Sequence, residues 1–486
     1  MERIMFNYIT KPKKINISQV MSNELALSPF NHRMIICKNN NLKFLSELVL
    51  LNEKGFEPGS YSYINFSNNH FIRISELSDE YYTFDITEAT NKIIPPKNKQ
   101  IQLSKYDLLY QTASNVGNIC FYIGSDNAYF NSHLRKIDLK DKYYCAAILK
   151  SNFGRQQVEV LGSIKGVDNF REEYLLNTVI PYPTFQNNQN PNDVIIYVSM
   201  LMQNIINKEE NIKIKNELID NLIFEELTQN QKKDIFKYVF PKINEIKSEY
   251  RIDTILYTEK YKRLEYLVTN YKNGYFYIPE SSIKPGKTPD DYFYTNYKAN
   301  NTYYWVTPKN IAQRRLIFRT YLHTKQKSNT KKLSLIFSGI RYVGNCYFVE
   351  NEKDPIFCNQ NTLVINHSDK IEEQLFILCY FSSQIGKKLQ LMQRVFGIVP
   401  ILYSKDFAKI PIPKIPTKKQ KEIIVEYYNS VNFDSDLTLN NYLIKEKVRN
   451  TKLGIFQLNS EILDLKEKLE LIIDKIINEQ KIDIDL

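Results

Sequence analysis

The sequence has few cysteines and histidines, and their positions match no common metal or disulfide framework. Six cysteines and five histidines are dispersed over 486 residues, with no Cys-x-x-Cys pair. Structural zinc sites need four ligands at short spacings, and disulfide scaffolds need paired cysteines in a secreted chain. We therefore expect no metal and a reducing, cytoplasmic environment. The cysteines are Cys37, Cys120, Cys145, Cys346, Cys358 and Cys379.

Long apolar runs are also missing. No stretch reaches the roughly 18 to 20 apolar residues that cross a bilayer, and no apolar segment of a signal peptide opens the sequence. The sequence therefore predicts neither export nor a membrane partner.

The motifs of the common cofactor enzymes are absent. An amino-methyltransferase needs an (Asp/Asn/Ser)-Pro-Pro-(Tyr/Phe) loop for a flipped base, but Pro95-Pro96 stands between Ile94 and Lys97. There is no Gly-x-Gly-x-x-Gly turn. The segment 285–288 (Pro-Gly-Lys-Thr) looks like the end of a phosphate-binding loop but has Ser281 where that loop needs glycine. With no Ser-His or Cys-His pair either, we expect a non-catalytic chain that binds no cofactor.

What the sequence does contain is enough apolar material for several cores, and a surplus of positive charge. Apolar residues make up 43% of the chain and aromatic residues 13%, which suits three or four folding units. The net charge is +11, yet residues 417–486 hold 11 Lys and Arg against 13 Asp and Glu. The surplus outside that segment favours an anionic partner such as DNA, although a solvated basic surface is the alternative.

The chain is internally duplicated. Val116-Gly117-Asn118 matches Val343-Gly344-Asn345 at an offset of 227, and an Ile-Pro-x-Pro stretch at 180–183 matches 410–413 at 230. A third match, at an offset of 219, pairs Leu45, Leu48, Val49 and Gly55 with Leu264, Leu267, Val268 and Gly274. Matches in one order at similar offsets indicate two diverged copies.

Each copy reads as an α+β unit followed by a long helix. Short β-branched and aromatic stretches alternate with turns, and heptad seams follow. The C-terminal seam predicts one helix over about 441–476, about 54 Å long. The first predicts a helix over about 193–222. Its seam is Val198, Met202, Ile205, Glu209, Ile212, Asn216, Ile219 and Ile223, and the C-terminal seam is Ile444, Val448, Thr451, Ile455, Leu458, Ile462, Leu465, Leu469, Ile472 and Ile476.

These features together resemble the specificity subunit of type I restriction–modification systems. The resemblance rests on the two Val-Gly turns, the Phe396-Gly397 pair, the two Ile-Pro-x-Pro exits, and Gln420 and Ile423, which resemble the family's helix opening. It implies an α+β fold with two tandem target recognition domains, separated by long helices that form an antiparallel coiled coil. The expected divisions are an N-terminal extension (1–40), recognition domain 1 (41–185), a central helical region (186–250), recognition domain 2 (251–416) and a C-terminal helical region (417–486).

The resemblance also implies partners and location. Each recognition domain reads one half of a split site in double-stranded DNA, while the helices set the gap and dock two adenine-N6 methyltransferase subunits. Motor-nuclease subunits join for restriction. S-adenosylmethionine, ATP and Mg are then expected on those partners, in a bacterial or archaeal cytoplasm. Two departures concern docking: the first exit lacks the Pro-x-x-Gln opening, and residues 224–262 exceed a simple linker.

The candidate DNA-reading residues carry forked or amide side chains, or lie beside glycine turns. Arginine suits guanine, asparagine and glutamine suit adenine, and lysine suits phosphate. Each one alone could equally be a solvated charge. In the first copy they are Ser114, Asn115, Asn118, Arg155, Gln156, Gln157, Lys165 and Arg171. In the second copy they are Lys309, Asn310, Gln313, Arg314, Arg315, Arg319, Arg341, Lys387, Lys388 and Arg394.

Two other classes of protein fit parts of this pattern. One is a scaffold that uses the helices for assembly and the α+β units for protein contacts. The other is the recognition subunit of a methyltransferase-only or type II-like system. Binding to random duplexes would separate the scaffold from the DNA readers.

Overall fold

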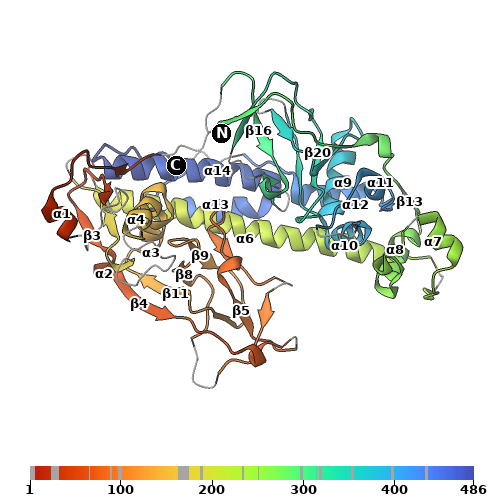
Figure 1. Cartoon of the computed structure of the whole chain (residues 1–486), viewed down its shortest axis with the longest axis horizontal. Coiled ribbons are helices and arrows are strands. Elements are labelled where there is room, and N and C mark those ends of the chain that lie inside the picture. Colours follow the sequence, from red (N-terminus) through yellow and green to blue (C-terminus); the bar gives the residue numbers. More distant parts are fainter. Residues whose placement is uncertain are drawn as a thin grey trace.

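Two α+β units lie on opposite sides of a bundle of long helices (Figure 1). The computed structural model describes residues 6–22, 32–64, 66–87, 90–96, 101–162, 175–185, 190–232, 235–249, 251–295, 299–312, 315–316, 320–351, 355–395, 399–432 and 436–486. No helix in these ranges is long and apolar enough to cross a membrane.

Unit 1 is built on a five-stranded sheet in the order β4-β11-β8-β9-β6. The central strands are apolar on both faces and fully buried, as in β8 (Leu108–Gln111) and β9 (Ile119–Tyr122), because helix α3 (Lys142–Lys150) and a smaller sheet cover them. The other elements are β4 (Val49–Lys54), β11 (Leu134–Leu139), β6 (Thr83–Phe84), β5 (His70–Ile72), β7 (Asn91–Lys92), β10 (Ala128–Phe130) and α4 (Asn152–Gly162).

Unit 2 repeats this arrangement with two four-stranded sheets, β14-β23-β20-β21 and β15-β19-β16-β22. Helices α9 (Ile371–Ser382) and α10 (Gln384–Gln393) follow, as α3 and α4 do in unit 1. The strands are β14 (Ile283–Pro285), β15 (Phe293–Thr295), β16 (Thr302–Val306), β17 (Ile311–Ala312), β18 (Arg315–Leu316), β19 (Tyr321–His323), β20 (Leu335–Ser338), β21 (Cys346–Phe348), β22 (Ile356–Cys358) and β23 (Thr362–Ile365).

The remaining short elements lie at the unit ends. Each Ile-Pro-x-Pro exit pairs with a strand near the start of its own unit, β12 (Val179–Pro181) with β3 (Leu42–Phe44) and β24 (Ile412–Pro413) with β13 (Tyr275–Phe276). The others are β1 (Ile9–Thr10), α1 (Ile17–Ser22), β2 (Met34–Ile35), α2 (Leu45–Leu48), α7 (Ile243–Glu249), α8 (Glu259–Thr269) and α11 (Ser404–Phe407).

The duplication is confirmed, but the match predicted at an offset of 219 is in the wrong register. Leu45 lies in the single turn of α2, whereas Leu264 lies inside α8. The true counterpart of Gly55 is Gly286, at an offset of 231. A Cβ on Gly55 would lie 2.2 Å from the carbonyl oxygen of Asn131, and one on Gly286 would lie 2.2 Å from that of Asn359. In the segment 285–288, which looks like the end of a phosphate-binding loop, Gly286 therefore allows the close approach of the chain at Asn359.

Helix α6 (Pro191–Gln229) is the axis of the bundle, and its predicted seam is confirmed. The side chain of Asn190 accepts from the amide of Asn192 and caps its start. Helix α14 (Ile455–Ile477) runs antiparallel to it, because Tyr197 lies under Lys468 whereas Lys208 meets Glu461.

The predicted single C-terminal helix is wrong at one point, Leu453-Gly454. There the chain reverses from α13 (Tyr442–Lys452) into α14, which leaves the first three seam members, Ile444, Val448 and Thr451, exposed on α13. A Cβ on Gly454 would lie 2.4 Å from the amide nitrogen of Asn429, just beyond α12 (Thr417–Tyr427). Only glycine tolerates this approach, so the contact with Asn429 fixes the place where the chain reverses. The heptad period does not reveal this contact.

A buried polar network joins α6, α13 and α14. Lys208 is buried, and its Nζ lies 2.5 Å from Glu461, 2.6 Å from Asn450 and 3.3 Å from Glu446. Arg449 pairs with both glutamates, at 2.7 Å to Glu446 and 2.5 Å to Glu461. Charges removed from water need such partners, and a shifted helix register would break all of these contacts together.

Candidate nucleic-acid interface

The two glycine turns are the same structure made twice. Each one joins two antiparallel strands, β8 to β9 in unit 1 and β20 to β21 in unit 2. The backbone is left-handed at equivalent positions, at Ser114 (φ 63°) and Gly117 (φ 83°) and at Arg341 (φ 56°) and Gly344 (φ 92°). Residues other than glycine rarely adopt this conformation, so both turns are held in place by their surroundings.

The helix that follows each sheet supports the turn. A Cβ on Gly117 would lie 2.8 Å from Val158 of α4, and one on Gly344 would lie 2.3 Å from Lys387 of α10. The turn of unit 2 therefore lies against a lysine of its helix, and the turn of unit 1 is linked to Arg155 of α4 through Asp79, which also bonds Asn115. This juxtaposition joins a rigid loop tip to cationic side chains, the combination that contacts to base edges and phosphates require.

In unit 1 the tip carries Ser114, which is exposed, and Asn115. Asp79 accepts a hydrogen bond from Asn115 and forms a 2.9 Å ion pair with Arg155 of α4. Burial alone would raise the pKa of the Asp79 carboxyl, but the hydrogen bond and the charge of Arg155 outweigh it and lower the pKa. The tip therefore carries one exposed hydroxyl, together with an amide and an arginine that both contact Asp79.

In unit 2 the tip carries Arg341 and Tyr342, both exposed. Lys387 and Lys388 of α10 lie half-buried behind it. The tip of unit 2 is therefore more basic and more aromatic than the tip of unit 1. Identical turns with different tip side chains suit two readers of different sequences.

Several predicted DNA contacts have polar atoms engaged within the protein. Asn118 is buried and accepts from Lys150 at 2.7 Å. Gln156 bonds the backbone of Phe6 and Tyr8, and Gln157 bonds both backbone groups of Val179. These amides connect segments far apart in sequence. We therefore leave them out of the reading surface.

Two predicted contacts in unit 2 also have internal roles. Asn310 accepts from the amide and hydroxyl of Thr307 and closes a short turn. Arg394 donates to the carbonyl of Leu391, and burial lowers the pKa of its guanidinium. Lys309, next to Asn310, is exposed and stays a candidate.

Some predicted residues have no described side chain, and all but one of them lie outside the described ranges. Arg315 is in β18, but its side chain is not described. The others are Lys165, Arg171, Gln313, Arg314 and Arg319, together with the Phe396-Gly397 pair of the resemblance.

The sequence interpretation missed Lys150, which lies beneath the first turn. This lysine is buried, and its Nζ donates to Asn118 and to the carbonyl oxygens of Ile119 (2.8 Å) and Ser78 (3.2 Å). Burial lowers the pKa of its ammonium group. A lysine at the end of an apolar stretch gives no sequence signal of this role.

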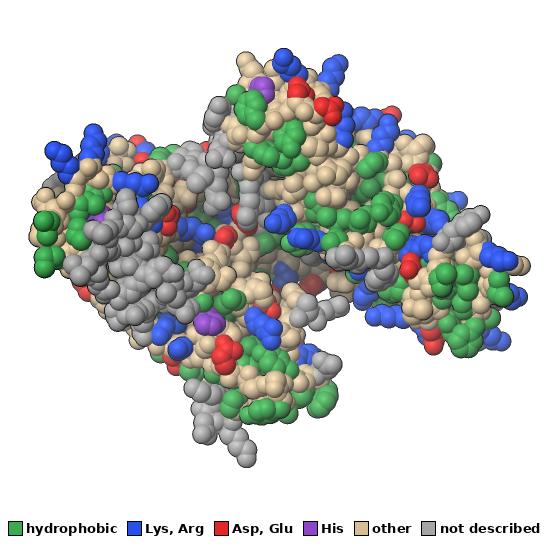
Figure 2. Space-filling model, in the orientation of Figure 1, with side chains coloured by type: hydrophobic (Ala, Val, Ile, Leu, Met, Phe, Trp, Pro, Cys, Tyr) green, Lys and Arg blue, Asp and Glu red, His purple; other side chains and the backbone are tan. Residues whose placement is uncertain are grey.

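Figure 2 shows the surface hollowed between the two units, with Lys and Arg side chains along its rims. Among the described residues, no group of three His, Cys, Asp or Glu side chains could hold a metal ion. The arrangement thus offers surfaces for a polyanion.

Comparison with known proteins gives the class of this fold. Residues 281–446 match the family model described as "Type I restriction modification DNA specificity domain". The match spans unit 2, α12 and the start of α13, and this part of the chain is similar to the DNA specificity domains of type I restriction–modification systems. No curated protein matches the chain.

The similar solved structures are distant in sequence. One is described as the S subunit of a type I restriction–modification system from M. genitalium, with 14% identity, 92% of this chain and 98% of that chain covered, and a TM-score of 0.36. Another is described as the HsdS subunit from Thermoanaerobacter tengcongensis, with 13% identity, 90% and 97% covered, and a TM-score of 0.25. The similarity to the family rests on residues 281–446.

Proposed function

We propose that the chain is the non-catalytic DNA-recognition subunit of a type I restriction–modification complex, in which each unit reads one half of a bipartite site. The observation that carries this proposal is the pair of glycine turns, which share left-handed positions and helix support but differ at the tip. Copies that read the same bases would not need Ser114 and Asn115 in one tip and Arg341 and Tyr342 in the other. The target is then asymmetric.

The helices supply the distance between the two half-sites. Helix α6 has 39 residues and spans about 58 Å at 1.5 Å per residue. This length corresponds to between one and two turns of duplex, at about 34 Å per turn. Units fixed to such a rod contact DNA at two separated places, and the bases between them are not read.

The partners and the division of the chain belong to the same proposal. Two adenine methyltransferase subunits bind the complex and carry S-adenosylmethionine, and motor-nuclease subunits carry ATP and Mg. We propose that the chain divides into an N-terminal extension (1–40), recognition domain 1 (41–185), a central helical region (186–250), recognition domain 2 (251–416) and a C-terminal helical region (417–486). The complex works in the cytoplasm, where its DNA lies.

The test is a methylation map of host DNA with and without this chain. We expect a split motif with methylated adenines that disappears when the chain is deleted. A variant with Ser114 and Asn115 replaced by alanine should relax only the half-site that unit 1 reads. An unchanged methylation map after deletion would contradict the proposal.

A further inference from the structure

The buried lysine beneath the glycine turn of unit 1 has its whole hydrogen-bonding capacity in use. Lys150 is the last residue of α3 and is only 5% exposed. Its ammonium group donates to the side-chain oxygen of Asn118 at 2.7 Å and to the carbonyl oxygens of Ile119 at 2.8 Å and Ser78 at 3.2 Å. An ammonium group has three hydrogens, and hydrogen bonds from a cation are stronger than neutral ones. Lys150 therefore holds these three oxygens together.

The three oxygens come from two different segments. Two of them belong to the base of the turn, whereas Ser78 begins residues 78–83, which we call the connecting segment. The second residue of this segment, Asp79, accepts a hydrogen bond from Asn115 at the tip of the turn. The turn is therefore tied to the connecting segment at its tip and, through the lysine, at its base.

The connecting segment is in turn held by the helix bundle. Lys466 of α14 donates to the carbonyl oxygen of Glu80 at 2.5 Å. Glu209 of α6 accepts from the amides of Tyr82 and Thr83. A series of charged groups therefore links both long helices, through the connecting segment and the buried lysine, to the base of the turn.

Unit 2 has a serine at the position of this lysine. A Cβ on Gly154 of α4 would lie 2.5 Å from a carbonyl oxygen of α3, and one on Gly386 of α10 would lie 2.2 Å from a carbonyl oxygen of α9. These matching contacts align the two units at an offset of 232, which makes Ser382 the counterpart of Lys150. The Ser382 hydroxyl donates to the carbonyl oxygen of Leu378 in its own helix.

The asparagine that follows each glycine is also used differently in the two units. In unit 1 the side-chain oxygen of Asn118 accepts from Lys150. In unit 2 the side-chain amide of Asn345 donates to the carbonyl oxygen of Ile311, in β17, at 2.9 Å. The same residue type therefore meets a cation in one unit and a backbone oxygen in the other. The two turns share a backbone conformation but are held by different groups.

We propose that Lys150 is a positioning residue for the DNA-reading turn of unit 1. It fixes the base of the turn on the connecting segment, so that Ser114 and Asn115 keep one position relative to the long helices. Base recognition needs such precision, because a site functions only when its side chains are held within about 0.5 Å of the productive geometry. This inference rests on the proposed function, which makes the turn a reader of DNA. It adds that the reader of unit 1 can be displaced without disturbing the reader of unit 2.

The test uses the full chain assembled with its methyltransferase subunits. Methylation of the cognate duplex is compared with methylation of duplexes that have one base pair changed in either half-site. The half-site of unit 1 is the one that relaxes when Ser114 and Asn115 are replaced. We expect Lys150→Met to lower discrimination at this half-site by about 5-fold or more, the lower limit for one good base contact, and to leave the other half-site unchanged. Lys150→Arg, which keeps the charge and the donors, should retain more of the discrimination.

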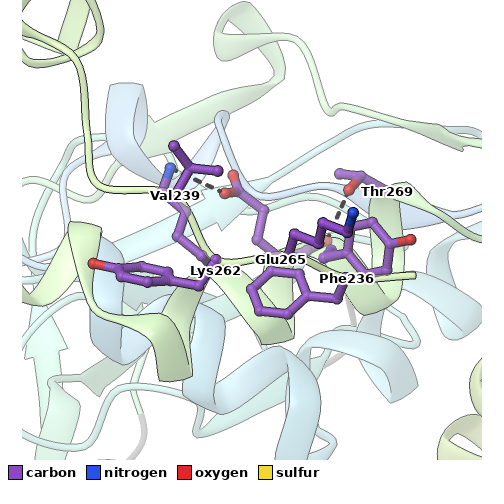
Figure 3. Close-up of a pocket in the computed structure, with 8 residues that line it drawn as sticks. Phe236, Val239, Lys262, Glu265 and Thr269 are labelled. Atoms are coloured by element: carbon purple, nitrogen blue, oxygen red, sulfur yellow. Dashed lines mark hydrogen bonds and ion pairs between the residues drawn. The ribbon is translucent and has the colours of Figure 1, made fainter. Parts of the chain in front are cut away.

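Lys262→Met is the matched control and should change discrimination at neither half-site. Lys262 of α8 lies 3.5 Å from Glu265 of the same helix. Both side chains line a cavity of about 280 Å³ between α8 and residues 236–239 (Figure 3). Among the described residues, the lining of this cavity includes none from either turn.

A second pair of variants tests the turn bases while the buried lysine stays in place. Asn118→Leu removes one of the three oxygens around Lys150 and should relax only the half-site of unit 1. Asn345→Leu removes the contact with Ile311 and should relax only the half-site of unit 2. These variants keep the inference testable if Lys150→Met does not fold.

The outcomes separate this inference from the function on which it rests. If the unchanged chain gives no split methylated motif, the proposed function is wrong. If the motif is present but folded Lys150→Met discriminates as well as the unchanged chain, or loses discrimination equally at both half-sites, Lys150 does not position the turn and the function stands. Equal losses for Lys150→Met and Lys150→Arg would mean that packing, rather than the ammonium group, places the turn. Circular dichroism melting shows whether each variant is folded.

Discussion

At the scale of single residues, the two turn tips present different chemistry from the same backbone. Unit 2 presents Arg341 and Tyr342, whereas unit 1 presents Ser114, Asn115 and an arginine held by Asp79. An arginine fork can bond guanine through two hydrogen bonds, and an asparagine can do the same with adenine. We therefore expect the side chains at these tips to determine which bases each half-site contains.

Arg341→Ala should weaken binding to the cognate duplex. Loss of one base contact costs about 1 to 3 kcal/mol, or roughly 5- to 150-fold in affinity. Lys331→Ala is the matched control, because Lys331 precedes β20 at the end opposite the turn and pairs with Asp369. Fluorescence anisotropy on cognate and random duplexes measures both variants, and equal losses on the two duplexes would mean a phosphate contact.

Asp79→Asn should make DNA binding more dependent on salt. The neutral amide no longer holds Arg155, whose guanidinium then becomes available to a phosphate. Each additional phosphate contact steepens the slope of log affinity against log salt by about 0.9. Asp369→Asn, at an exposed ion pair, is the control, and an unchanged slope for Asp79→Asn would show that Arg155 does not reach the DNA.

At the scale of elements, the buried network of Lys208, Glu446, Arg449 and Glu461 keeps three helices in one register. Two antiparallel apolar seams could slide by a heptad at moderate cost. Buried charges could not, because each would lose its partner in a region without water. The distance between the units is therefore fixed by charges as well as by apolar packing.

Glu446→Gln should lower the free energy of unfolding by about 3 to 5 kcal/mol at neutral pH, because Lys208 and Arg449 lose a buried anion. Burial alone would raise the pKa of Glu446, but its hydrogen bonds and cationic neighbours lower it below the usual 4.5. A carboxyl whose pKa is lowered by folding stabilises the fold above its unfolded pKa and loses this effect as the pH falls through its folded pKa.

The difference in unfolding free energy between the unchanged chain and Glu446→Gln should therefore be constant above about pH 5. It should decrease as the pH falls below 4.5. Urea unfolding at a series of pH values, followed by circular dichroism, measures this difference. Glu217→Gln, at an exposed residue of α6, is the control. A difference that persists at low pH would mean that lost packing, rather than lost charge, destabilises the variant.

At the scale of the whole molecule, each long helix holds the unit that belongs to the other half of the chain. Glu470 of α14 accepts from the amide of Asn152 at the start of α4 in unit 1, at 3.1 Å. Asp220 of α6 accepts from the amide of Gln384 at the start of α10 in unit 2, also at 3.1 Å. Carboxylates at helix N-termini are stabilising, and these two tie each unit to the bundle.

Unit 1 has a further tie to the bundle. Glu209 of α6 is buried and accepts from the amides of Tyr82 and Thr83, at 2.9 Å each, and from the Thr83 hydroxyl. Lys466 of α14 lies 3.4 Å from the same carboxylate. Glu209, one of the two polar members of the α6 seam, is thus one point where unit 1 attaches.

The double change Glu470→Gln/Asp220→Asn should loosen both units on the bundle. We expect a stability loss of about 1 kcal/mol for each site, and methylation of substrates whose half-sites are one base pair closer or farther apart than the cognate gap. A panel of duplexes with different gaps measures this tolerance, with Glu217→Gln as control. If only the cognate gap is methylated, these carboxylates do not set the spacing.

The sequence by itself determined the features that depend on local pattern. The Val-Gly turns, the Ile-Pro-x-Pro exits and the seams of α6 and α14 each lie within a short stretch, so period and residue type were enough to predict them. For the same reason the duplicated fold, the long antiparallel helices and the role in DNA specificity could be predicted without the structure.

Only the tertiary structure decided the features that depend on contacts between distant segments. The reversal at Gly454 follows from its approach to Asn429, and the roles of Gln156 and Gln157 follow from the backbone groups that they reach. Lys208 is separated by more than 230 residues from each partner in its network. A glutamine or lysine has the same local pattern whether it faces DNA or the core, and only the fold brings its partner to it.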